Sequence, residues 1–219
     1  MTRDLEVPAD GPRAQAQARN ADDLALLAAW QAGDPRAGDT LARLYSAQVV
    51  RFFAEKVRDF EVDDLVQQTW EAMIHARDRF APTLYSDPEM EASAPSAPSI
   101  ASFRAYLYGT ARMVLYGHFR QRTKAQQFDP GVSALEDLAP SPSRQMSAYA
   151  KLEQLAAALR KLPLDVQVLL ELRYALEMTS TEIATIHGIP PGTVKSRLRV
   201  AKQRLDAQLA RMGLPPAPG

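Results

Sequence analysis

Positively charged side chains are concentrated near the end of the chain, in the segment "TVKSRLRVAKQRL" that runs from Thr193 to Leu205. It holds five Lys or Arg residues and no Asp or Glu. Cationic groups on one helix face can neutralise phosphates, while polar side chains near them reach base edges. A merely solvated helix face, the usual explanation of a basic run, more often interleaves Glu for pairs four residues apart. The pattern therefore favours DNA binding.

Apolar residues of the same segment recur at helical spacing. They lie four, three and four residues apart, which predicts a helix with one buried face made of Val194, Leu198, Ala201 and Leu205. The preceding residues 187–190, His-Gly-Ile-Pro, have the length and the glycine of a helix-turn-helix connection, whose second helix enters the major groove. The residues expected to contact duplex DNA are Thr193, Lys195, Ser196, Arg197, Arg199 and Lys202.

A second basic segment has aromatic residues among its charges, and residues 92–128 contain no Asp or Glu. Unstacked bases lie on aromatic rings while cations follow the backbone, and each stacked base contributes ~1–3 kcal/mol. For any single ring, packing in the core is the alternative, and Phe103, Leu107 and Val114 form one candidate buried stripe. The residues expected to face single-stranded DNA are Arg104, Tyr108, Arg112, Tyr116, Arg120, Arg122 and Lys124.

These two segments belong to a chain without net charge, with 26 Lys or Arg residues and 26 Asp or Glu residues. Zero net charge argues against a protein that coats nucleic acid indiscriminately. The balancing acid lies in "DFEVDDL" from residue 59 and in the loop and linker segments. Because this acidic stretch is separate from both basic segments, it suggests a protein partner rather than DNA.

Residues for catalysis are not apparent. The three histidines fall in three separate predicted helices, and neither a phosphate-binding glycine loop nor an activated nucleophile is present. Glu71 and His75 are four residues apart, but two ligands are too few for a metal site. We therefore expect no enzymatic activity, cofactor or metal. The absence of cysteine fits a reducing cytoplasm, and the N-terminus does not resemble a secretory signal. The sequence contains no apolar run of ~18 residues, the length needed to cross a membrane.

Helical periodicity dominates the chain and no alternating strand pattern of useful length occurs, so we expect an all-α fold. Asp22 and Asp34 are the expected N-caps of the first two helices, with Pro35 at the first position of the second. Near the C-terminus, Thr179 and Glu182 have the spacing of a capping box. The buried side of the third helix is expected to comprise Leu65, Val66, Thr69, Trp70, Met73 and Ile74.

Two segments rich in Pro, Ser and Ala interrupt the helices. We therefore expect two small helical domains joined by a flexible linker, the C-terminal one a helix-turn-helix domain. The expected boundaries are 1–20 for a disordered arm, 21–124 for the first domain with a loop at 81–99, 125–145 for the linker, 146–212 for the second domain and 213–219 for a tail.

The ordered combination of segments resembles the ECF-type sigma factors, the smallest members of the bacterial sigma-70 family. The likeness covers about Asp22 to Arg211. "GTVKSRL" alone is weak evidence, since other helix-turn-helix regulators carry similar residues. The segments that carry the likeness are "DDLVQQTWEAMIHA", similar to region 2.2; "FRAYLYGTARMVLYGHFRQR", similar to regions 2.3 and 2.4; and "ALRKLPLDVQVLLELRYALEMTSTEIATIHGIPPGTVKSRLRVAKQRL", similar to region 4.

This resemblance implies a dissociable cytoplasmic subunit that binds core RNA polymerase and directs it to promoter DNA. The region 2-like domain would engage the melted −10 element, and the region 4-like domain would read the −35 element in duplex form. The residues that the resemblance places against the clamp helices of the largest polymerase subunit are Asp63, Asp64, Leu65, Gln67 and Gln68. An inhibitory anti-sigma factor as a further partner is left open by the sequence.

Two features depart from the family pattern. The loop that in the family can cradle a flipped promoter base is long here and carries three acidic residues. Pro190 stands where a Ser cap is usual, so the recognition helix is expected to lack a side-chain cap, worth ~1 kcal/mol. The rival interpretation is a conventional helix-turn-helix regulator with a helical sensor domain, which would explain the C-terminal half but neither the acidic stretch nor the basic aromatic helix.

Overall fold

The computed structural model describes residues 12–79, 102–123, 128–134 and 150–217, and every regular element in these ranges is helical. Extended pairing within them is limited to one isolated bridge between Ala134 and Pro163. The all-α prediction is thus confirmed. The loop predicted at 81–99 and most of the linker predicted at 125–145 lie outside the described residues. Within the described residues, no helix combines the length and the apolar character needed to cross a bilayer.

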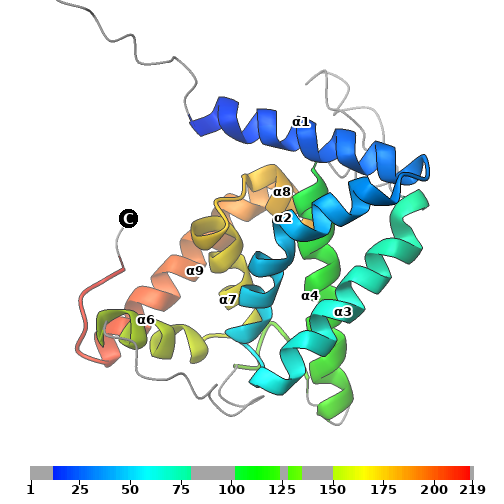
Figure 1. Cartoon of the computed structure of the whole chain (residues 1–219). Coiled ribbons are helices and arrows are strands. Elements are labelled where there is room, and N and C mark those ends of the chain that lie inside the picture. The colour runs from blue at the N-terminus through cyan, green and yellow to red at the C-terminus, as the bar shows by residue number, and fades with distance from the viewer. Residues whose placement is uncertain (1–11, 80–101, 124–127, 135–149, 218–219) are drawn as a thin grey trace, which may run out of the picture.

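The helices form two groups that face each other (Figure 1). The N-terminal half contains α1 (Pro12–Gln31), α2 (Pro35–Ala54), α3 (Asp59–Ala76), the short 3-10 helix η1 (Arg77–Arg79) and α4 (Phe103–Arg122). The C-terminal half contains α6 (Ala150–Arg160), α7 (Leu164–Leu170), the π-helical η3 (Glu171–Ala175), α8 (Ser180–His187) and α9 (Pro191–Arg211).

Local capping signals explain where several helices begin. The Asp34 side chain accepts a hydrogen bond of 2.9 Å from the Arg36 amide, and Pro35 takes the first helical position as predicted. The prediction for α1 was wrong, because the helix begins at Pro12 and not after Asp22. Residues 12–20 are therefore not a disordered arm. Ala, Gln and Arg dominate this stretch and favour helix, and neither Gly nor a second Pro interrupts it.

The helical period of α3 sets which of its residues reach the core. Leu65, Thr69 and Met73 are buried, as the spacing predicts. Ile74, also expected on the buried side, keeps 49% of its surface exposed. It follows Met73 directly, and one residue along a helix rotates the side chain by about 100°, so both cannot face the same core.

The C-terminal half contains the predicted helix-turn-helix. Thr179 and Glu182 form the capping box at the start of α8, with amide-to-side-chain distances of 3.2 and 2.9 Å. Gly188 ends α8 with φ of 62°, a left-handed conformation that favours glycine. The chain then turns into α9, whose buried residues include Val194 and Ala201.

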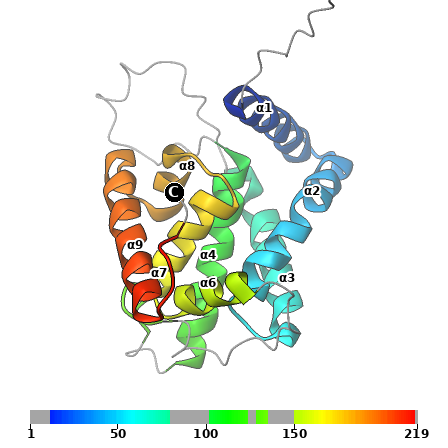
Figure 2. The ribbon, with the colours of Figure 1, turned by 90° about the vertical axis from the view of Figure 1, so that its left-hand side faces the viewer.

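The two halves, which correspond to the two helical domains expected from the sequence, pack on each other. Buried apolar residues from both halves belong to one continuous core. The main contact is between α4 and α8, and Figure 2 shows α4 between the other N-terminal helices and the C-terminal group. The face of α4 that meets the C-terminal half is therefore covered.

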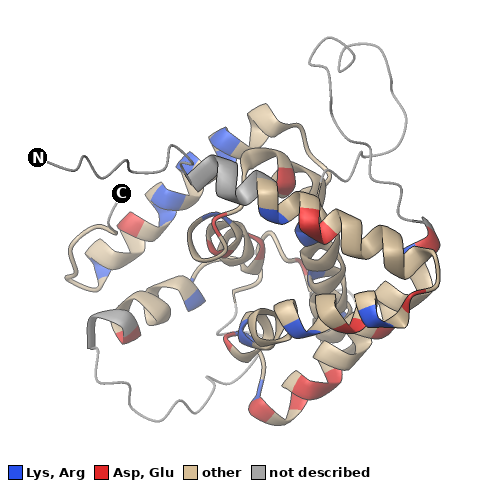
Figure 3. Ribbon diagram, turned by 45° about the horizontal axis from the view of Figure 1, so that its top comes forward, with Lys and Arg blue, Asp and Glu red and all other residues tan. Residues whose placement is uncertain are grey.

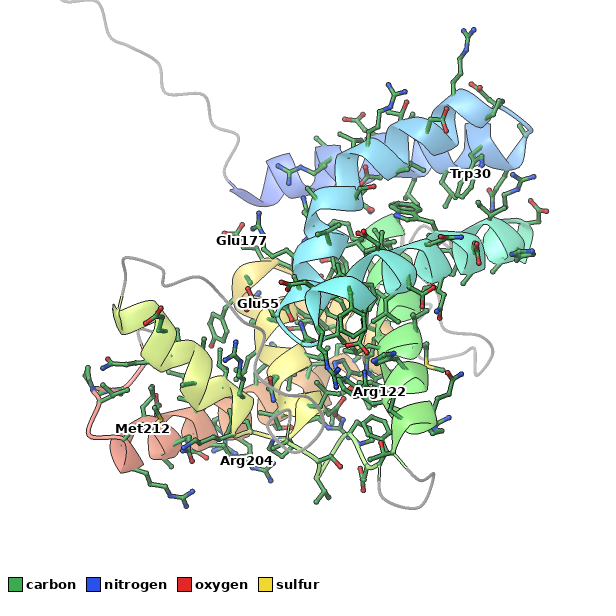
Figure 4. All side chains as sticks on the ribbon, turned by 60° about the horizontal axis from the view of Figure 1, so that its bottom comes forward. Trp30, Glu55, Arg122, Glu177, Arg204 and Met212 are labelled. Carbon is green, nitrogen blue, oxygen red and sulfur yellow. The ribbon has the colours of Figure 1, made fainter. Side chains whose placement is uncertain are left out.

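Close packing of α1 on α2 gives a stability prediction. A Cβ atom on Gly38 would lie 2.6 Å from the indole nitrogen of Trp30, the residue at the end of α1 in Figure 4. The Trp30 ring has little freedom to move, since it is 7% exposed and the Arg77 guanidinium lies 5.6 Å from its centroid. Gly38→Ala should therefore lower the free energy of unfolding by ~1–3 kcal/mol, as overpacking does.

The matched control is Gly109→Ala in α4, where an added Cβ would meet no atom within 4 Å. This change should raise the free energy of unfolding by ~0.5–1 kcal/mol, because alanine is the better helix former. Chemical denaturation of both variants measures whether each change raises or lowers the free energy of unfolding. A stabilised Gly38→Ala protein would contradict the packing argument.

Candidate functional site

The basic face of α9 is directed away from the core. Val194, Ala201 and Leu205 are buried, while Leu198 is half-buried. Of the six residues expected to contact duplex DNA, four are exposed and two are half-buried: Lys195, Ser196, Arg197 and Arg199, then Thr193 and Lys202. Arg204 lies on the same helix (Figure 4). The structure thus places the whole predicted set on the outer side of the second helix of the helix-turn-helix.

The start of α9 has the chemistry expected from its proline pair. Pro190 is the N-cap and makes no side-chain capping bond, as predicted. No acidic residue lies in the first turn of α9. The first amide groups are therefore left for solvent or for an anion, which a helix N-terminus attracts.

An acidic and amide-rich face lies on α3, well separated in sequence from α9. Asp63, Asp64, Gln67 and Gln68 are exposed. Gln68 donates a hydrogen bond of 2.8 Å to Asp64, four residues earlier on the same helix. Leu65 was also expected on this face, but it is 1% exposed and belongs to the core. Figure 3 shows that some helices carry mainly acidic or mainly basic residues, while others carry both.

The aromatic residues predicted to stack on DNA bases are buried. Tyr108 is fully enclosed, with its ring 5.8 Å from that of Phe52, and its hydroxyl lies 3.3 Å from the Gln48 side-chain oxygen. Tyr116 is 6% exposed and its ring packs edge-on against Phe128. In this conformation neither ring can stack on a base, so the core alternative describes both of them.

The basic residues of the same helix divide into two groups. Arg120 and Arg122 are exposed near the end of α4, and Arg122 pairs with Glu61 of α3. Arg104 and Arg112 are half-buried and face the C-terminal half. The remaining predicted residue, Lys124, lies outside the described residues.

Asp165, in the first turn of α7, joins several of these groups. Its carboxylate accepts hydrogen bonds from Arg112 at 3.1 Å and from the Tyr116 hydroxyl at 2.7 Å. The His187 Nδ1 atom lies 3.5 Å away. Burial alone would raise the pKa of Asp165, but the Tyr116 hydroxyl and the Arg112 guanidinium outweigh it and lower that pKa. Sequence analysis missed this residue, since an acidic residue in a helix's first turn is explained by the helix dipole alone.

His187 is neutral at its place in the fold. Its side chain is 1% exposed, and burial lowers its pKa to about 4 despite the neighbouring Asp165. Arg112 and Arg197 lower it further. Among the described residues, no group of three acidic or histidine side chains is arranged to hold a metal ion.

The buried imidazole predicts a pH-dependent stability. The unfolded chain binds a proton on His187 below about pH 6.5, whereas the folded chain resists it, so stability is complete above that pH and falls towards pH 4. Between pH 7 and pH 5 the free energy of unfolding should decrease by about 2 kcal/mol from this group. Asp165, whose pKa is lowered, stays ionised over this range.

Chemical denaturation at several pH values measures the slope of the free energy of unfolding against pH. His187→Gln should flatten most of it, and burial of His118 contributes a part in the same direction. His75→Gln, at an exposed position, is the control that should leave the slope as it is. An unchanged slope in His187→Gln would show that this imidazole is not the titrating group.

Comparison with protein families supports the assignment of the C-terminal half. Residues 152–205 match the family model described as Sigma-70, region 4. This range contains α7, α8 and the first two-thirds of α9, including all six residues of the exposed basic face.

Relatives match over both halves. The RNA polymerase sigma factor CnrH of Cupriavidus metallidurans is 29% identical over 199 residues, covering 85% of this chain and 94% of that protein. The ECF RNA polymerase sigma-E factor of Escherichia coli is 25% identical, covering 84% of this chain and 92% of its own length. Because the match is not confined to the helix-turn-helix, a conventional regulator with an unrelated sensor domain is not favoured.

Solved structures agree with this result. CnrH in complex with the cytosolic domain of CnrY has a TM-score of 0.56 and 25% identity, over 87% of this chain and 98% of that one. The sigma factor RpoE in complex with the anti-sigma factor NepR from Bartonella quintana has the same TM-score at 23% identity, over 78% and 96% of the two chains, and supports the fold. The chain is thus similar over both halves to the ECF-type RNA polymerase sigma factors, and residues 152–205 match region 4 of the sigma-70 family.

Proposed function

We propose that this sigma factor uses three surfaces, defined by the residues above. The exposed face of α9 reads the −35 element as duplex DNA. The basic side of α4 contacts the melted −10 element. The acidic face of α3, made of Asp63, Asp64, Gln67 and Gln68, binds core RNA polymerase. The protein performs no catalysis itself and works in the cytoplasm, where its polymerase acts.

The observation that carries the proposal is the position of the α9 basic residues. They lie on the outer side of a helix that follows a left-handed Gly188 turn, and Glu182, the one acidic residue of α8, is hydrogen-bonded to Thr179 and Ser102 instead of to them. In a helix-turn-helix, residues in the first turns of the second helix contact base edges, and basic residues further along contact phosphates. The first turns of α9 contain Thr193, Lys195 and Arg197, and the part further along contains Lys202.

The face on α3 fits a protein partner. Its exposed carboxylates would repel phosphates. Leu65, on the opposite side of α3, packs in the core. At a protein interface, exposed Asp and Gln side chains contribute more to specificity than to affinity. The partner consistent with the family is core RNA polymerase.

A protein inhibitor is a further proposed partner. Two structural relatives, CnrH and RpoE, are in complexes with CnrY and with the anti-sigma factor NepR respectively. We infer that a protein of the anti-sigma kind also binds this chain. The test is transcription with core polymerase in the presence of a protein that co-purifies with this chain. Such a protein should inhibit the transcription.

The first functional prediction concerns promoter reading. With core RNA polymerase, the purified chain should give transcripts only from particular members of a promoter library. Arg197→Ala should reduce discrimination at one promoter position by ~1–3 kcal/mol, because a bidentate contact to a guanine is lost. Measurement of transcription across the library shows the affected position.

Arg211→Ala is the matched control, since Arg211 is exposed at the opposite end of the same helix. It should leave the discrimination unchanged. An even loss of activity across all promoters in Arg197→Ala would instead assign Arg197 to a phosphate. Transcription without promoter preference by the wild-type chain would contradict the proposed function.

The second functional prediction concerns polymerase binding. Replacing Asp64 and Gln67 with Ala should weaken the complex with core polymerase about fivefold to tenfold, the effect of losing roughly 1 kcal/mol at an interface. Titration of labelled chain with core polymerase measures this change. Asp39→Ala, at an exposed acidic position on α2, should bind normally. Normal binding by the double variant would remove α3 from the interface.

A further inference from the structure

Val200 is an apolar residue on the basic outer side of α9. Its side chain keeps 40% of its surface exposed, whereas Val194 and Ala201 of the same helix are buried. The structure describes α9 along its whole length, and of its five Val and Leu residues only Val200 is exposed. Sequence analysis missed this residue, since charge and hydrogen-bonding capacity identified the set expected to contact duplex DNA.

Helical spacing places Val200 beside three members of that set. Residues separated by three, one and three positions share one side of a helix, and α9 has four of them in this order: Thr193, Ser196, Arg197 and Val200. A homeodomain reads the major groove with residues at the same spacing on its recognition helix. Val200 therefore occupies the fourth position of a reading face whose first three positions are polar.

The surroundings of Val200 leave its methyl groups open to a ligand. Figure 2 shows α9 at the edge of the molecule, on the side away from α2 and α3. Ser196, one turn earlier, has a short side chain whose hydroxyl donates a hydrogen bond of 2.9 Å to the Thr193 carbonyl. Gln203 and Arg204, three and four residues after Val200, are exposed. A base edge that approaches this side of α9 would therefore meet the valine directly.

The chemistry of a valine at this position selects one base. In the major groove, thymine is the base that presents a methyl group. Contact between this methyl group and valine removes apolar surface from water, and the valine loses little freedom because it has one strongly preferred rotamer in a helix. Against a purine, the same side chain would cover the N7 acceptor without offering a donor, which is unfavourable. Against cytosine, the methyl group is missing.

Cations around Val200 can hold it against the bases. Arg204 follows it by one turn on the same side of α9, and Arg199 and Lys202 lie on the adjoining side. The sequence has no Asp or Glu between residues 183 and 205 to compete for these cations. Contacts from such residues to phosphates fix the position of a helix in the groove without carrying sequence information. The specificity then depends on the uncharged side chains between them.

We propose that Val200 reads the methyl group of a thymine in the −35 element and thereby determines part of the promoter specificity. This inference rests on the proposed function, in which α9 lies in the major groove of duplex DNA. Val200 follows Arg197 by three residues, a rise of ~4.5 Å, and neighbouring base pairs are ~3.4 Å apart. The thymine should therefore lie about one or two base pairs from the position that Arg197 reads.

Removal of the methyl group from the DNA tests the contact. The probes are duplex promoter fragments that carry the −35 element preferred by the complex of this chain with core RNA polymerase, with each thymine in turn replaced by deoxyuridine. Deoxyuridine keeps the O4 acceptor and lacks only the methyl group. In competition binding with the wild-type complex, one replacement should weaken binding about fourfold, the effect of losing one buried methyl group.

Variants of the valine show whether it makes this contact. Val200→Ala should weaken binding of the thymine fragment by a similar factor and should abolish the difference between thymine and deoxyuridine. Val200→Ile, which keeps a branched apolar side chain, should retain the difference. The matched control is Val50→Ala on α2, at a valine with 38% of its surface exposed. It should leave the ratio of the two affinities unchanged.

Three outcomes would overturn the role of Val200 and leave the proposed function intact. They are a preferred −35 element without thymine, equal binding of all fragments by the wild-type complex, and a deoxyuridine effect of the same size in Val200→Ala. In each of them the wild-type chain still selects promoters. A wild-type chain without any promoter preference would instead contradict the proposed function, and with it the inference that depends on it.

Discussion

The carboxylate of Asp165 fixes the position of the two halves relative to each other. It lies in the first turn of α7, where the helix dipole favours an anion, and it accepts hydrogen bonds from Arg112 and Tyr116 of α4. Only 25% of its side chain is exposed, so loss of a partner would leave a poorly solvated charge. His187, at the end of α8, stays neutral beside it. This anion therefore contributes to the orientation of the helix-turn-helix on α4, together with the contacts of Arg104 and Ser102.

Charge in this neutral chain is separated according to the surface it occupies. Basic side chains on α9 are exposed, and acidic side chains on α3 are exposed on another part of the molecule. A third set of charges faces inward between the halves, where Lys56 and Arg112 meet carboxylates. Net charge alone excludes only indiscriminate binding to nucleic acid. The spatial separation fits the proposal of one surface for duplex DNA on α9 and another for a protein on α3.

Sequence could predict the features that depend on neighbours within one turn of helix. The Asp34 cap, the box of Thr179 and Glu182 and the outward face of α9 are of this kind. Tyr108 shows the limit, because an aromatic residue between arginines fits either a base or a core, and its burial follows from Phe52 on another helix. Arg112 and Asp165 are 53 residues apart, and no periodicity links them. Sequence thus predicted which side of α9 faces outward but not the contact that joins α4 to the C-terminal half.

The contact between the two halves combines apolar packing with directional polar contacts. Apolar contacts across the halves are non-directional, and they stabilise the closed form according to the area removed from water. The polar contacts add less net free energy, because their hydration returns when the halves separate, but they fix the register of α7 and α8 on α4. A ligand shifts such an equilibrium only by its difference in affinity for the two states. A ligand that competes with Asp165 for the Arg112 guanidinium would have such a difference.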